Sequence, residues 1–183
     1  REPSESNFFT RDTLPVDAKA PAADFWITKA EAWPEAWSVS DDSIAWTSGL
    51  KSWKKLAKRG LWINGCSDGL GEKELEKIDT LLGREPKWLR LTHSGSEATS
   101  RKAKLATYRL VSRSKAPDLR GKTHFYWMSF SNFQEAVRSH PEVRNGFHAC
   151  GPGQTFSLLA REIPEERLQI FPRYEDWKKS ICN

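Results

Sequence analysis

Cysteine is scarce in this chain of 183 residues, and patterns of metal ligands are missing from it. The three cysteines, Cys66, Cys150 and Cys182, have no metal or redox spacing, and an odd number argues against a disulfide framework. The four histidines show no paired spacing of the kind that zinc enzymes use. We therefore expect no metal and no disulfide framework, and we expect a protein of the reducing cytoplasm.

Long apolar runs are also missing, so no segment is predicted to cross a membrane. Hydrophobic residues make up only 38% of the chain, but nine Trp and nine Phe supply large buried surfaces. This composition predicts a globular protein with small cores, in one ordinary domain or two small ones. The 29 Lys and Arg residues against 24 Asp and Glu give a net charge of +5, which favours an acidic partner without identifying it.

Short apolar runs alternate with polar turns and helical patterns, and this order occurs twice. The first copy is two strands, each followed by a helix: strand 43–48, helix 50–59, strand 61–64 and helix 72–82. The second copy has the same order: strand 124–128, helix 132–139, strand 147–150 and a helix that ends at 161. Such alternation is typical of parallel α/β units, and its repetition predicts an α/β protein with two lobes.

The remaining segments suggest how the lobes are divided. Residues 1–23 are polar and rich in proline, which predicts a tail or a linker from a longer polypeptide. Other expected elements are strand 24–29, strand 88–92, helix 97–105, strand 106–112, strand 168–171 and helix 174–181. We predict a discontinuous first lobe, 24–40 plus 112–183, and a second lobe, 41–106. The chain would then cross near 38–42 and 107–111, which implies a two-strand linker, parallel sheets flanked by helices and a cleft between the lobes.

Polar residues follow the predicted strands in an order that resembles uroporphyrinogen-III synthases. The matching motifs are Thr28-Lys29, Thr47-Ser48, Gly65 to Asp68, Tyr108 in a linker strand, Ser129 and the turn Gly151–Thr155. The order covers nearly the whole chain after residue 24, although each motif alone is weak. The chain departs from the family in having Lys29 where the family has Arg, in a shortened segment before Thr47, and in Gly153-Gln154 within the last turn.

The resemblance implies a lyase of tetrapyrrole and heme biosynthesis that uses no cofactor. The family cyclises hydroxymethylbilane to uroporphyrinogen III, with inversion of ring D. The substrate is an anionic linear tetrapyrrole, either released by hydroxymethylbilane synthase or handed over within a fusion to that enzyme. We expect a monomer with no membrane partner and no nucleic-acid partner.

The resemblance also implies roles for individual residues. Tyr108 is expected to assist departure of the substrate hydroxyl as a general acid, with packing of a linker strand as the alternative. The residues expected to bind the substrate, mainly through its carboxylates, are Thr28, Lys29, Thr47, Ser48, Gly49, Gly65, Ser67, Ser129, Gly151, Gly153, Gln154 and Thr155. Backbone N–H groups at helix N-termini and hydroxyl groups suit that task, because carboxylates need many donors. Helix capping is the alternative role of Thr47, Ser48 and Ser129.

Three other interpretations stay open on the sequence. The lysine-rich run at 51–59 is predicted to be a solvated helix face, with steering of an anionic substrate as the alternative. Two alternatives to the enzyme also stay open: a tetrapyrrole-binding homologue without catalysis, and a basic α/β module that binds nucleic acid. The last interpretation lacks the sequence of a recognition helix or of an RNA-binding sheet.

Overall fold

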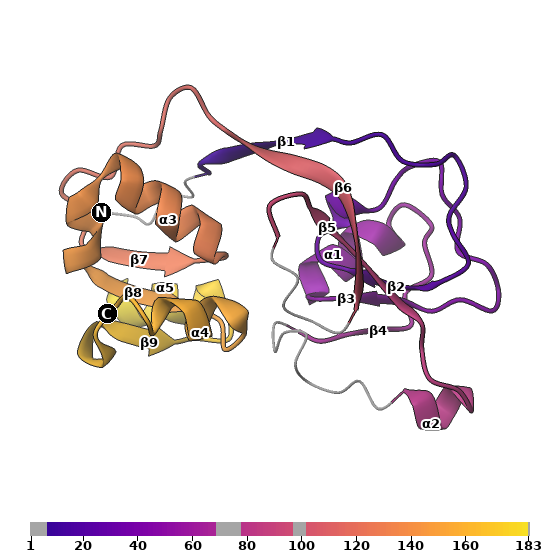
Figure 1. Ribbon diagram of the computed structural model, residues 1–183. Coiled ribbons are helices and arrows are strands. Elements are labelled where there is room, and N and C mark those ends of the chain that lie inside the picture. Colours follow the sequence, from indigo (N-terminus) through magenta and orange to yellow (C-terminus); the bar gives the residue numbers. More distant parts are fainter. Residues whose placement is uncertain (1–6, 69–77, 97–101, 183) are drawn as a thin grey trace. The chain divides into compact units, whose positions relative to one another are not determined.

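The computed structural model describes residues 7–68, 78–96 and 102–182 and divides into two compact units (Figure 1). The central unit is Arg11–Leu110, and the terminal unit combines Arg1–Thr10 with Val111–Asn183. The chain passes from one unit to the other within strand β1 (Phe9–Thr13) and within strand β6 (Ala103–Ser112). The fold is α/β with two separate sheets, as the alternation in the sequence predicted.

Six strands form the sheet of the central unit, in the order β1-β6-β5-β2-β3-β4. Besides β1 and β6, they are β2 (Asp24–Ile27), β3 (Ala45–Thr47), β4 (Gly65–Cys66) and β5 (Trp88–His93). All pairs from β6 to β4 are parallel. Strand β1 runs antiparallel to β6, since Leu14 N–H donates to Thr107 O while Phe8 O accepts from Arg113 N–H. The sheet is therefore mixed, whereas the sequence predicted a parallel one.

The core of the central unit lies between one face of the sheet and two short helices. Helix α1 (Leu50–Ala57) and the 3-10 turn η1 (Ala30–Ala32) contact each other and this face, where Phe25 and Ile27 project on alternate positions of β2. Strand β2 is buried at every position, as expected for a parallel strand covered on both sides. The short helix α2 (Asp79–Leu82) ends at Gly83, which adopts a left-handed conformation with φ 64°.

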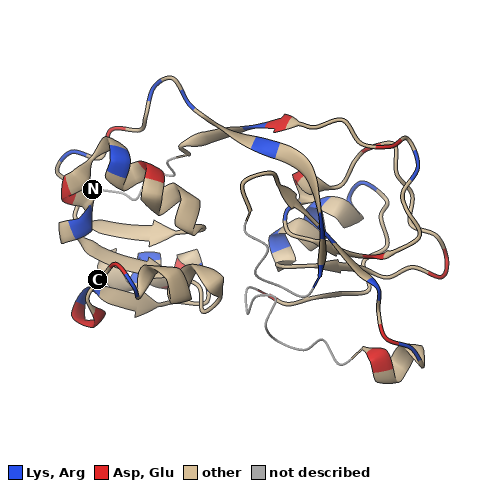
Figure 2. Cartoon of the chain, in the orientation of Figure 1, with Lys and Arg blue, Asp and Glu red and all other residues tan. Residues whose placement is uncertain are grey.

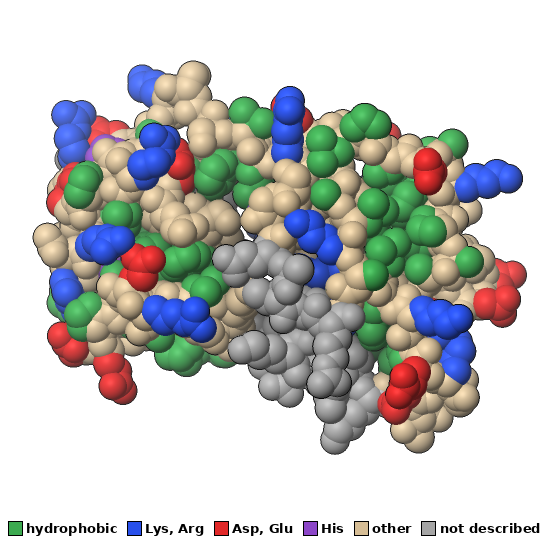
Figure 3. All heavy atoms as spheres, viewed as in Figure 1, with side chains coloured by type: hydrophobic (Ala, Val, Ile, Leu, Met, Phe, Trp, Pro, Cys, Tyr) green, Lys and Arg blue, Asp and Glu red, His purple; other side chains and the backbone are tan. Residues whose placement is uncertain are grey.

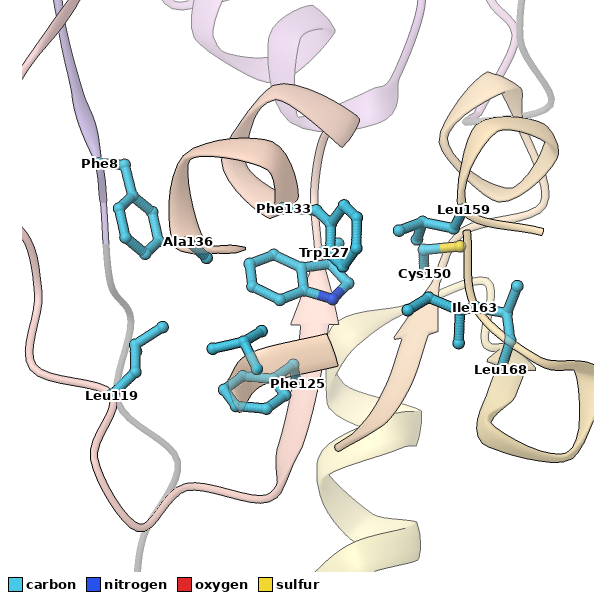
Figure 4. Packing of buried hydrophobic residues seen from close by; sticks show 11 residues of the cluster. Phe8, Leu119, Phe125, Trp127, Phe133, Ala136, Cys150, Leu159, Ile163 and Leu168 are labelled. Carbon is cyan, nitrogen blue, oxygen red and sulfur yellow. The ribbon is translucent and has the colours of Figure 1, made fainter. Parts of the chain in front are cut away.

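The terminal unit has a three-stranded parallel sheet with helices on both faces. Its strands, in the order β7-β8-β9, are β7 (His124–Trp127), β8 (Phe147–Cys150) and β9 (Leu168–Ile170). Its helices are α3 (Phe130–Ser139), α4 (Gln154–Leu159) and α5 (Tyr174–Cys182), with 3-10 turns η2 (Pro141–Asn145) and η3 (Glu165–Arg167). Trp127 packs against Phe133 of α3 on one face (Figure 4), and Tyr126 packs against Trp177 of α5 on the other.

The observed units differ from the predicted lobes at the start of the chain. Residues 24–40 were assigned to the lobe that contains 112–183, but β2 pairs with β3 and β5 and so lies in the central unit. The first crossing is accordingly at Thr10–Arg11 and not at 38–42, while the second, at Leu110–Val111, falls within 107–111. The prediction erred because it linked strand 24–29 to a distant lobe, although its nearest parallel partner follows directly in sequence.

Three other predicted segments differ or are described only in part. Part of the proposed tail is ordered: β1 pairs with β6, Val16 and Ala20 pack against the core, and the Trp37 indole donates to Asp17 O at 2.8 Å. The predicted helix 97–105 is strand β6 from Ala103 onward, and its residues 97–101 lie outside the described part. Of the predicted helix 72–82, residues 72–77 lie outside the described part, and the structure describes a helix at Asp79–Leu82.

Candidate functional site

The candidate site lies where parallel strands of the central unit end. Thr28 and Lys29 follow β2, and His93 ends the neighbouring strand β5. The backbone N–H and the hydroxyl of Thr28 both donate to Leu91 O, at 3.2 and 2.9 Å, and fix the residue after β2 against β5. Ligands of open α/β sheets bind at this carboxyl edge, so these residues occupy a suitable position.

An irregularity in the pairing of β5 with β6 brings His93 opposite Tyr108. The register runs from Thr92 opposite Ala106 to His93 opposite Tyr108, so that Thr107 is skipped. The two rings lie 5.8 Å apart between centroids, and Ser94 N–H donates to Tyr108 O at 2.9 Å. Bulges of this kind re-aim a side chain at the end of a ladder, and here one pairs an imidazole with a phenol.

Tyr108 remains protonated at neutral pH in this setting. The side chain is 3% exposed, and this burial raises the pKa of the phenol above its usual value of 10.0. The side chains of Arg11 and Thr28 lie close to the hydroxyl and partly oppose that rise in pKa. A protonated phenol beside a cation is able to donate a hydrogen bond, or a proton, to an oxygen of a ligand.

Positive charge collects around Lys29, the residue after Thr28. Burial lowers the pKa of Lys29, and repulsion by Arg11, Lys51 and Lys55 lowers it further, while Glu31 raises it. Glu31 is itself paired with Lys55 at 2.8 Å. Burial deprives the Lys29 ammonium of water that would stabilise its charge. A negative ligand stabilises the ammonium by supplying a favourable charge interaction in place of that water.

Two more cations, Arg90 in β5 and Lys104 in β6, donate to the turn that follows β5. Arg90, 5% exposed, donates from Nη2 to Ser96 Oγ at 2.7 Å, and Lys104 Nζ donates to the carbonyls of Ser94 and Ser96 at 2.8 and 2.7 Å. Burial lowers the pKa of His93, and Arg90, Lys104 and Arg11 lower it further, so the imidazole is neutral at pH 7. The side chains therefore combine neutral hydrogen-bonding groups with fixed positive charge, an arrangement suited to an anion.

The predicted hydroxyl residues next to this group serve the fold. Thr47 is fully buried and its hydroxyl lies 3.4 Å from Gly49 O. Ser48 Oγ accepts from the indole of Trp26, and Ser67 Oγ accepts from the indole of Trp46, both at 3.1 Å. A Cβ on Gly65 would lie 2.1 Å from the Trp46 ring, so this glycine is required by packing. Gly49, the N-cap of α1, has open space around its Cα.

In the terminal unit the predicted residues form an uncharged set. Ser129 is the N-cap of α3, and its hydroxyl accepts from Asn132 N–H at 3.4 Å, so the capping role exists. Gly151 follows β8 and has open space where a Cβ would lie. Gly153 is the N-cap of α4, which begins with the exposed Gln154 and the half-buried Thr155. No charged side chain occurs in Gly151–Thr155.

The structure thus brings Thr28 and Tyr108 together, and Arg11 acts on both Tyr108 and Lys29. Ser48 is joined to the end of β2 through the bond from its N–H to Ile27 O at 3.1 Å. The sequence interpretation missed four residues of this group: Arg11, Arg90, His93 and Lys104. The alternation in β5, where Trp88, Arg90 and Thr92 share one face, was the available signal for Arg90.

No protein-family model matches the chain, and no curated protein sequence matches it. Among the described residues, no three or more His, Cys, Asp or Glu side chains are grouped so as to hold a metal ion. None of the helices at 7–68, 78–96 and 102–182 has the length and apolar character that a membrane span requires.

Proposed function

We propose that this protein is a uroporphyrinogen-III synthase, which cyclises hydroxymethylbilane to uroporphyrinogen III with inversion of ring D. The observation that carries the proposal is a group of residues near the carboxyl ends of β2 and β5, within a field of fixed positive charge. Thr28 and Lys29 follow β2, and Tyr108 of β6 lies opposite His93, the last residue of β5. The order of the polar motifs and the two α/β units connected within β1 and β6 agree with the family pattern.

The reaction requires a proton donor at the terminal hydroxyl of the substrate and many hydrogen-bond donors for the substrate carboxylates. In our proposal the Tyr108 phenol gives its proton to the terminal hydroxyl of the substrate, which leaves as water. The resulting azafulvene cation on ring A is attacked by ring D, which passes through a spiro intermediate and closes the inverted ring. Loss of a proton from the new ring carbon restores the phenol. The eight substrate carboxylates offset the nearby cations, so the cationic intermediate is not disfavoured.

Selectivity in this reaction comes from position, since the same substrate closes spontaneously to the uninverted type I ring. Arg11 supplies charge near Tyr108 and also acts on Lys29, and Thr28 lies beside the phenol. For the terminal unit, the resemblance assigns carboxylate binding to Ser129 and Gly151–Thr155. No cofactor enters any step of the proposed reaction.

The test is an assay of freshly generated hydroxymethylbilane with separation of the product isomers. We expect type III to dominate in the presence of the protein and type I in its absence. The Lys29→Gln variant should need more substrate for half-maximal rate, because a charge that attracts carboxylates is removed. Formation of type I alone, at the uncatalysed rate, would refute the proposal. Tight binding of the product without turnover would instead identify a tetrapyrrole-binding homologue.

A further inference from the structure

Helix α1 carries three lysines along one face, and a fourth, Lys58, is its C-cap. Lys51, Lys54, Lys55 and Lys58 are spaced i, i+3, i+4 and i+7, which places them on adjacent turns of the same side. All four are exposed, whereas Ser52 and Leu56 are buried. We call Lys51, Lys54, Lys55 and Lys58 the lysine stripe. Figure 2 shows basic positions on α1, and Figure 3 shows Lys and Arg side chains at the surface.

The repulsion within the stripe is not balanced by acidic residues of its own helix. Like charges at i, i+3 and i+4 repel, and α1 contains no acidic residue to interleave with them. Lys51 lies in the first turn, where the helix dipole favours negative charge. Within the described part of the chain, Lys55 has an acidic partner in Glu31, but Lys51, Lys54 and Lys58 have none. The helix dipole favours Lys54 and Lys55 in the last turn, but the repulsion between the lysines is left for an external anion to reduce.

The stripe is continuous with the candidate site through Lys29. Lys51 and Lys55 both lower the pKa of Lys29, so their charges lie close to it. The ion pair between Lys55 and Glu31 joins α1 to η1, which begins directly after Lys29. Arg11 acts on Lys29 from strand β1. Positive charge therefore extends from the surface of α1 to the half-buried ammonium of Lys29.

We infer that the lysine stripe and Lys29 form one binding surface for a small anion that carries several carboxylates, and that this surface guides the anion to the site around Tyr108. The identity of the ligand rests on the proposed function, but the surface itself does not. Eight residues of helix span about 12 Å, which suits a small multiply charged molecule better than an extended polymer. Net repulsion within the stripe would fall as carboxylates bind along it.

The probe is benzenehexacarboxylate, which has six carboxylates and does not react. Its affinity is measured by calorimetry over a series of salt concentrations, on the full chain. Lys51→Gln combined with Lys54→Gln removes two charges but no ion pair of the described residues, and Gln keeps helix propensity. We expect affinity to fall about tenfold at low salt, with a smaller salt dependence.

The matched control is Lys178→Gln combined with Lys179→Gln in α5 of the terminal unit. This pair is also exposed and its loss changes the net charge equally, but Glu175 and Asp176 already balance the local charge. We expect the control to bind within about twofold of the unchanged protein. Equal weakening in both variants would overturn the inference, because net charge alone would then explain binding. Thermal unfolding of both variants checks that each is folded.

The same variants separate this inference from the proposed function. Stripe-dependent binding of the hexacarboxylate without cyclisation would support the surface and refute the proposed reaction. Cyclisation with an unchanged second-order rate in the Lys51/Lys54 variant would overturn the surface and leave the reaction standing. A single-stranded oligonucleotide serves as a second probe: if it binds through the stripe while the hexacarboxylate does not, the surface belongs to a polymer and the inference is wrong.

Discussion

The two units have related α/β architecture but place charge differently. In the central unit, the charge of Arg11 acts on both Lys29 and Tyr108, whereas the corresponding residues of the terminal unit are the uncharged Ser129 and Gly151–Thr155. The buried polar groups also differ. The central unit buries the charged carboxylate of Asp24, and the terminal unit buries the neutral imidazole of His148.

The difference indicates that the amino ends of the central strands serve stability, whereas the carboxyl ends are suited to a ligand. At the amino ends of its strands, Asp24 accepts from Arg84 at 2.7 and 2.9 Å and from the N–H groups of Ile44 and Lys87 at 3.0 and 2.7 Å. The buried carboxylate at this end is thus paired, while Lys29 at the other end has no acidic partner in contact among the described residues. Fully satisfied charge stabilises the fold, and incompletely neutralised charge marks a place for a ligand.

The largest effect should follow loss of the Asp24 carboxylate. Burial alone would raise the pKa of Asp24, but the hydrogen bonds from Arg84, Ile44 and Lys87 lower it overall, so the group is charged when folded. Asp24→Ala should destabilise the central unit by about 3 kcal/mol, because buried donors lose their acceptor. Hydrogen exchange read by mass spectrometry should show faster exchange in peptides of Arg11–Leu110.

The control for that change is the Asp118 carboxylate of the terminal unit. Asp118 pairs with Arg120 at 2.8 Å, but both side chains are exposed. Asp118→Ala should leave exchange in both units unchanged, since exposed pairs contribute little. Equal exchange rates in Asp24→Ala and the unchanged protein would show that the central unit does not depend on this carboxylate.

The terminal unit should lose stability in acid because of His148. The ring is 2% exposed, its Nδ1 accepts from the Trp127 indole at 2.9 Å, and burial lowers its pKa to about 4. Below pH 6.5, the ordinary pKa of histidine, the His148 imidazole binds a proton in the unfolded chain. In the folded unit the same imidazole stays neutral until its pKa of about 4 is reached. Stability of this unit should therefore be constant above pH 6.5 and fall by about 1.4 kcal/mol per pH unit towards pH 4.

Urea unfolding followed by exchange in peptides of Val111–Asn183, at several pH values, measures this slope. His148→Gln should be less stable at neutral pH, because it disturbs the contact with Trp127, but it should lack the slope. An undiminished slope in that variant would assign the acid sensitivity to another group.

Much of this comparison could be predicted from the sequence, and the limits have physical causes. Alternating strands and helices predicted two α/β units, and the family resemblance proposed Thr28, Lys29 and Tyr108 as site residues without predicting which of them are neighbours. The pairing of β2 was missed because all four of its residues are buried, so no alternation indicated its partners. Arg11 and His93 were missed because one reaches the site through an antiparallel strand and the other through a bulge, and neither has a local signal.

Replacement of a single hydroxyl should separate the roles of two tyrosines, one in each unit. Tyr108→Phe should lower cyclisation by about tenfold, less than many general acids contribute, because the substrate hydroxyl leaves readily. In the terminal unit, Tyr126 donates its hydroxyl to Phe171 O at 3.0 Å, and Tyr126→Phe should affect stability without changing turnover. Steady-state rates and thermal unfolding of both variants measure the contrast. Unchanged turnover in Tyr108→Phe would leave that phenol with a packing role.

The smallest effect concerns Ser129, where capping and ligand binding make different demands on the same oxygen. Ser129→Ala removes the acceptor for Asn132 N–H and should destabilise the terminal unit by about 1 kcal/mol. Ser129→Asp keeps an acceptor at the N-cap, and its charge suits the helix dipole, so stability should be retained. If Ser129 also donates to a substrate carboxylate, the Asp variant should lose turnover through repulsion while remaining folded. Thermal unfolding and the cyclisation assay are measured on both variants. Full turnover in the Asp variant would restrict Ser129 to capping and leave carboxylate binding to the charged residues of the central unit.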